Sequence, residues 1–133
     1  MKTFMITVVF ILVAGTALAG YEHHRVSPDM NKQHSAMLAT DKEWELCKKS
    51  LATGDLAAAG AALERMKTVL IDLEKFRPHR RQERYMEFQE EARNFKIKLT
   101  KLMEAVKEKK NGETQGLLDK IDGGCMMCHE KFR

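Results

Sequence analysis

The chain has 133 residues, of which 44% are hydrophobic and 32% are charged, with a formal net charge of +4 at neutral pH. This length permits one small domain with a modest core rather than several domains. A charge this small gives no reason to expect binding to nucleic acid or to a charged membrane surface. We therefore expect a single domain with no nucleic-acid partner.

The first 19 residues have the pattern of a secretory signal peptide. Lys2 precedes an apolar stretch over residues 4–13, and small residues lead up to Ala19, where we expect cleavage. An uncleaved membrane anchor is the alternative, but the apolar stretch is shorter than the roughly 20 residues that a span needs. After cleavage we expect no stable membrane insertion, a short flexible leader over residues 20–26, and a folded domain over residues 27–133 in the periplasm.

From residue 27 onward the apolar residues repeat at steps of three and four, which predicts helices throughout. Ser27 is a candidate N-cap, and Gly54 is a candidate C-cap for the first helix. We expect four helical segments joined by connections of two to four residues: 27–54, 55–76, 78–112 and 114–133.

Three of these segments carry a continuous apolar seam. The seam of the second segment includes Leu63 and Leu70, that of the third includes Phe88 and Phe95, and that of the fourth ends at Phe132. Short connections make successive helices antiparallel neighbours. The sequence therefore predicts an all-α protein, an antiparallel up-down-up-down four-helix bundle with room for a cofactor in its core.

The end of the last segment carries a C-x-x-C-H run formed by Cys125, Cys128 and His129. This spacing lets two thiols bond one haem while the histidine binds its iron, so we expect one covalently attached haem c. A redox dithiol, half of a zinc site or a chance disulfide are weaker readings. Zinc needs about four ligands, the only other cysteine is Cys47, and no strand pattern accompanies the run as in redox C-x-x-C proteins.

The seam of the first segment is unusually polar and offers candidates for the far side of the iron. In an up-down bundle the start of the first helix lies level with the end of the fourth, so Met30, His34 and Met37 reach the height of His129. Their heights span about 10 Å at 1.5 Å per residue, which does not select one of them. Met37 and His34 remain equal candidates for the distal ligand, with an open site or Met30 as the other options.

These features together resemble the class II cytochromes c, the family of cytochrome c′ and its low-spin, methionine-ligated relatives. The resemblance covers residues 20–133 and depends mainly on the C-x-x-C-H-x-x-F-R run at residues 125–133, because most other c-type cytochromes carry the motif near the N-terminus. The run Gly54-Asp55-Leu56 at the start of the second helix adds weaker support.

The resemblance implies thioether bonds at Cys125 and Cys128, His129 as the proximal iron ligand, and Arg133 close to the proximal side. In this family one first-helix residue sets the distal face: methionine fills it for electron transfer, whereas a bulky aliphatic residue leaves it open to NO or CO. Several relatives dimerise, so the resemblance also leaves a homodimer open. Phe88 and Phe95 are expected to contribute to the haem environment.

The expected function is electron transfer by a periplasmic monohaem cytochrome that exchanges electrons with periplasmic redox partner proteins. The alternative is a cytochrome c′-like protein that binds NO or CO. An enzyme is not expected, because no acid-base set accompanies the haem motif. We also expect Trp44 and Cys47 to be core residues, and the basic run at residues 77–84 to be either a solvated helix start or a docking surface for an acidic partner.

Overall fold

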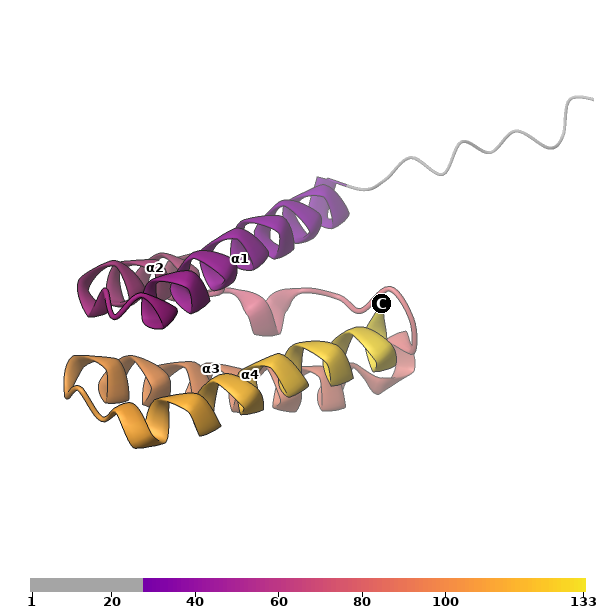
Figure 1. Cartoon of the computed structure of the whole chain (residues 1–133). Helices are drawn as coiled ribbons and strands as arrows, with labels where there is room; N and C mark the ends of the chain where they lie inside the picture. Colours follow the sequence, from indigo (N-terminus) through magenta and orange to yellow (C-terminus); the bar gives the residue numbers. More distant parts are fainter. Residues whose placement is uncertain (1–27) are drawn as a thin grey trace, which may run out of the picture.

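A computed structural model of the chain describes residues 28–133. Figure 1 shows a bundle in which successive helices run antiparallel and the hairpin of the first two helices lies over the hairpin of the last two. The four α-helices are α1 (Pro28–Ala52), α2 (Leu56–Val69), α3 (Tyr85–Lys107) and α4 (Asn111–Phe132). The described range contains no strand, so the predicted all-α fold with four helices is confirmed.

The predicted signal peptide, the leader and the Ser27 cap lie outside the described residues. Within residues 28–133, none of the helices combines the length and apolar character needed to cross a membrane.

The turn between α1 and α2 follows the prediction from the sequence. Gly54 has a φ of +77°, a left-handed conformation that glycine adopts without steric cost. The Asp55 side chain then accepts a hydrogen bond of 2.9 Å from the Ala58 N–H and caps the start of α2. These two residues reverse the chain and set α2 against α1.

The connection between α2 and α3 corrects the sequence prediction. The second helix was expected to reach residue 76 and the third to begin at Pro78, but α2 ends at Val69 and α3 begins at Tyr85. Two 3-10 turns, Leu73–Lys75 and Gln82–Arg84, lie within this connection. Proline disfavours helical geometry in the residue before it, and Arg81 has a φ of +55°, so no continuous helix forms here.

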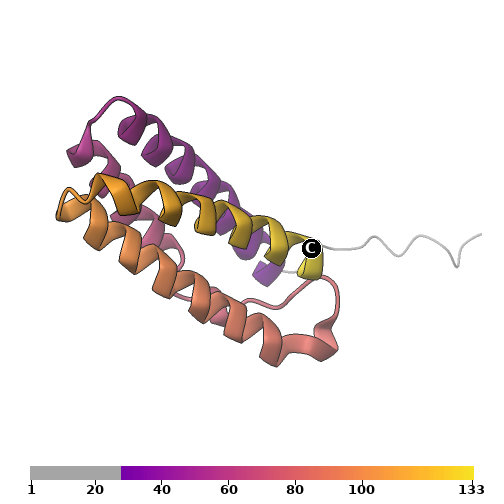
Figure 2. The same ribbon diagram turned by 60° about the horizontal axis from the view of Figure 1, so that its bottom comes forward.

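This longer connection is fixed by contacts with α3 and α4. The Lys96 ammonium on α3 donates to the Ile71 carbonyl and pairs with the Glu74 carboxylate at 3.0 Å. The Phe132 carbonyl at the end of α4 accepts hydrogen bonds of 3.0 and 3.1 Å from the N–H groups of His79 and Arg80. Figure 2 shows the connection passing around the end of the bundle where α4 ends.

The core fills the space between the helices along most of their length. Within the described range it contains twelve buried residues, among them Leu63, Leu102 and Ile121, and both Trp44 and Cys47 belong to it, as predicted. A second, smaller cluster lies at the end where α1 begins and α4 ends. This aromatic cluster consists of Phe76, Phe88 and Phe132, and Met37 packs against both clusters.

Candidate functional site

The cysteines of the C-x-x-C-H run lie on the inner side of the last turns of α4. Cys125 packs against the main core and Cys128 packs against the aromatic cluster, and both are half-buried. Met126 and Met127 between them are 73% and 48% exposed. Side chains three residues apart share a helix face, so the two thiols point inward together while the intervening methionines face solvent.

Aromatic side chains, among them Phe88 and Phe95, lie near the C-x-x-C-H run. Phe88 meets Phe132 edge to face at 5.4 Å between ring centroids, within the cluster that contacts Cys128. Phe95 lies so close to Gly124 that a Cβ added there would be 3.6 Å from the ring. The environment of the motif is therefore largely apolar.

This environment changes the chemistry of the thiols. Burial, with smaller contributions from the nearby Asp122 and Asp41 carboxylates, raises the pKa of Cys125 to about 11. Burial and Glu91 also raise the pKa of Cys128, against an opposing effect from Lys131. Both groups are therefore neutral thiols at pH 7. Redox-active C-x-x-C pairs have lowered thiol pKa values instead, so these pKa shifts disfavour the redox-dithiol interpretation.

The disulfide and zinc-site interpretations of the C-x-x-C-H run can be compared with the contacts of its cysteines. Cys47, Cys125 and Cys128 are all free cysteines. Among residues 28–133, no three or more His, Cys, Asp or Glu side chains come together in a group that could hold a metal ion. A haem does not need such a group, because two thiols and one imidazole from the protein are enough to attach it.

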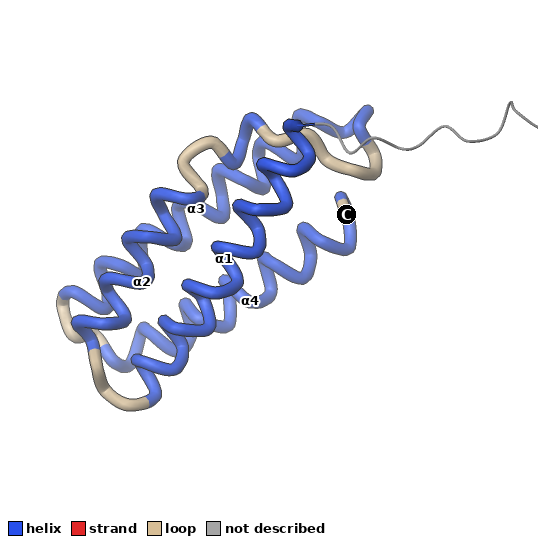
Figure 3. The backbone as a smooth tube through the Cα atoms, turned by 90° about the horizontal axis from the view of Figure 1, so that it is seen from above, coloured by secondary structure: helices blue, strands red, loops and turns tan. Residues whose placement is uncertain are grey.

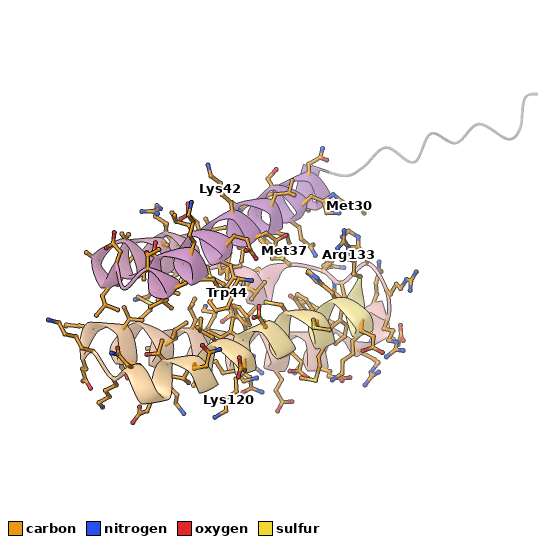
Figure 4. All side chains as sticks on the ribbon, viewed as in Figure 1. Met30, Met37, Lys42, Trp44, Lys120 and Arg133 are labelled. Atoms are coloured by element: carbon orange, nitrogen blue, oxygen red, sulfur yellow. The ribbon has the colours of Figure 1, made fainter. Side chains whose placement is uncertain are left out.

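Of Met37 and His34, Met37 is the one whose side chain packs inside the bundle. It is half-buried and packs against the main core, as Cys125 does, and against the aromatic cluster, as Cys128 does. Figure 4 shows its side chain extending from α1 toward α4. His34, by contrast, is exposed. The start of α1 does lie at the level of the end of α4, as the bundle topology predicted.

The structure brings His34 to His79, which the sequence analysis considered only as part of the basic run at residues 77–84. The Nε2 atoms of His34 and His79 are 3.2 Å apart, and their ring centroids are 5.0 Å apart. His79 is held close to the end of α4 by its hydrogen bond to the Phe132 carbonyl. No signal in the sequence indicated this pairing, because the two residues are 45 positions apart and His79 was expected within a helix.

Charged residues fasten α4 to α3 beside the motif. The Lys131 ammonium lies 2.9 Å from Glu91 and 3.3 Å from Glu87, and Arg84 also pairs with Glu87. Arg133 is exposed at the chain end, as Figure 4 shows. Three arginines of the basic run are exposed and form no ion pair with any described residue: Arg77, Arg80 and Arg81. The connection that carries them lies at the end of the bundle where the C-x-x-C-H run is.

A cavity of about 440 Å³ opens farther along the bundle. Its lining runs from Asp122, one turn before Cys125, to Gly54 in the α1–α2 turn. Neither His129 nor Met37 contributes to this lining. We therefore do not assign this cavity to the site around the motif.

Comparison of the chain with known protein families, with curated proteins and with solved structures gave no match. The residues and their geometry therefore carry the functional argument.

Proposed function

We propose that this protein is a periplasmic monohaem c-type cytochrome of the class II type that transfers electrons between redox partner proteins. Cys125 and Cys128 form the two thioether bonds, and His129 is the proximal ligand. The observation that carries this proposal is the C-x-x-C-H run, with both thiols turned toward the apolar interior at the end of the bundle.

The residues around the motif fit a haem. Thioether formation adds each S–H group across a vinyl group of the haem, and neutral thiols on one helix face are suited to that addition. Phe88 and Phe95 offer apolar surface for the macrocycle, while exposed Arg133 and Arg80 near the chain end could balance its propionates. When bound, the haem supplies an iron that cycles between the ferrous and ferric states.

We assign the distal position to Met37 rather than to His34. Met37 packs against the same two clusters as the haem cysteines, so its thioether lies on the interior side of α1, where the haem would be held. His34 is exposed and its imidazole is engaged by His79, which makes it the weaker candidate. A thioether opposite a histidine raises the reduction potential and leaves no open site, which suits an electron carrier.

Absorption spectroscopy tests this proposal on protein produced in a host with c-type maturation machinery. We expect a covalent haem, a low-spin spectrum in both oxidation states, and no change when CO is added to the reduced protein. Met37→Ala should convert the iron to a high-spin form that binds CO. Met127→Ala removes an exposed methionine next to the motif and is the matched control, with an unchanged spectrum.

Other outcomes would contradict specific parts of the proposal. Loss of the sixth ligand in His34→Ala instead of Met37→Ala would reassign the distal position. Prompt CO binding by the unmodified protein would identify a cytochrome c′-like binder of NO or CO. Absence of covalent haem, despite intact Cys125 and Cys128, would reject the cytochrome assignment.

A further inference from the structure

The proposed haem site leaves the pair of His34 and His79 without a role. Their Nε2 atoms face each other at 3.2 Å, one from α1 and the other from the connection between α2 and α3. Figure 3 shows these two segments meeting near the end of the bundle. His34 is exposed and His79 is half-buried, so both imidazoles can be reached from solvent.

The separation of the two nitrogens matches that of two imidazoles on one tetrahedral metal ion. With zinc–nitrogen bonds of about 2.0–2.1 Å, nitrogens 3.2 Å apart subtend an angle of about 100–106° at the metal. An ideal tetrahedral angle would place them about 3.3 Å apart, whereas a right angle would place them about 2.9 Å apart. The observed distance is therefore closer to tetrahedral geometry.

We propose that His34 and His79 form a binding site for a divalent transition metal, with Zn²⁺ as the ion that fits best, and with water completing its coordination. This site is separate from the haem site and does not depend on the proposed function. The N–H of His79 is anchored on the Phe132 carbonyl, and His34 lies within a regular helix, so both backbones are fixed before the metal binds.

The position of the pair gives the metal a structural consequence. Zinc would join the start of α1 to the connection that is itself bonded to the end of α4. These are the segments that carry Met37 and His129. A bound metal would therefore hold the two sides of the proposed haem site together, and it should raise the melting temperature of the protein.

Calorimetric titration of the haem-loaded full chain with ZnCl₂ tests the proposal. The reference protein carries His23→Gln and His24→Gln, which removes two adjacent histidines that could bind zinc adventitiously. We expect one saturable site in this reference and a rise in its melting temperature. His34→Ala and His79→Ala should each weaken zinc binding about tenfold or more and abolish the rise.

Three results would overturn the proposal. These are the absence of saturable zinc binding in the reference, zinc binding by both single variants that is as tight as in the reference, and a change of the iron ligation when zinc is added. The last result would place one of the two histidines on the haem iron. If no haem attaches, the same titration on a chain with Cys125→Ser and Cys128→Ser keeps the test independent of the proposed function.

Discussion

Trp44 and Asp122 form the hydrogen bond that joins α1 to α4 one turn before Cys125. The indole N–H donates to the Asp122 carboxylate at 2.6 Å, and Figure 4 shows Trp44 pointing from α1 toward α4. A hydrogen bond to a charged group contributes about 1.5–3 kcal/mol. Because the Asp122 side chain is 48% exposed, solvent screening reduces the expected contribution to about 1–1.5 kcal/mol.

A double-mutant cycle isolates this contribution. Asp122→Ala should lower the free energy of unfolding by about 2–3 kcal/mol, because it also leaves a buried indole N–H without a partner. Trp44→Phe should cost about 2–3 kcal/mol, from the lost hydrogen bond and the smaller ring. The double variant should be about 1–1.5 kcal/mol more stable than the sum of the single effects indicates.

Urea unfolding of the protein, followed by circular dichroism at the helix band, measures all four stabilities. Fluorescence is unsuitable because Trp44 is the only tryptophan in the chain. Lys48→Met shows how much the neighbouring ammonium contributes. Lys48 lies 3.9 Å from Asp122, pairs with Glu45 at 2.6 Å and lies 5.8 Å from the Trp44 ring centroid, all at partly exposed positions, so this variant should cost about 0.5–1 kcal/mol. Strictly additive single variants would show that this hydrogen bond does not hold α1 to α4.

Three further predictions concern the stability of the bundle, each measured by urea unfolding. Leu63→Ala empties a fully buried core position and should cost about 2–5 kcal/mol. Gly54→Ala, at a φ of +77°, should destabilise the protein by about 1 kcal/mol, whereas Gly60→Ala inside α2 has open space for its methyl group and should stabilise it by about 0.5–1 kcal/mol. Burial raises the pKa of Cys47 from 9.0 to about 11, so the stability from the neutral thiol is present below pH 9 and is lost as the pH rises through 11. The stability of Cys47→Val relative to the unmodified protein should therefore grow by about 2.3 kcal/mol between pH 8 and pH 11, and a constant difference would contradict this.

The orientation of the motif was predictable because it depends only on helical periodicity. Cys125 and Cys128 continue a seam that begins with Leu118 and Ile121, and a straight helix keeps such a seam on one face. The burial of Trp44 and Cys47 followed from the same rule applied to α1. These predictions needed no knowledge of which segments meet in space.

The end of α2 was mispredicted because the apolar pattern does not change where the helix ends. Leu70, Leu73 and Phe76 continue the repeat in steps of three, and a 3-10 turn presents residues three apart on one side just as an α-helix does. The difference lies in the backbone hydrogen bonds. The N–H groups of Lys75 and Phe76 bond to carbonyls three residues earlier, and this change carries no signature in residue type.

The pair of His34 and His79 was missed for a related reason. Each histidine alone has ordinary surroundings in the sequence, and only the longer connection brings His79 beside α1. An uninterrupted helix from Pro78 would not have wrapped around the end of α4. The error in the connection therefore propagated to the choice between His34 and Met37, which sequence reasoning left open.

The end of α4 and the start of α1, which would hold the two sides of the proposed haem, are fixed by different kinds of contact. The end of α4 is bound on one side by the Lys131 ion pairs with α3 and at its last carbonyl by the connection. The start of α1 packs against the aromatic cluster through Ala36 and Met37, and His34 contacts His79. The proposed proximal side is thus fixed by charges and backbone hydrogen bonds, while these contacts of the proposed distal side are apolar packing and a contact between two imidazoles. A change in distal ligation should therefore come from movement of α1, with α4 and His129 staying in place.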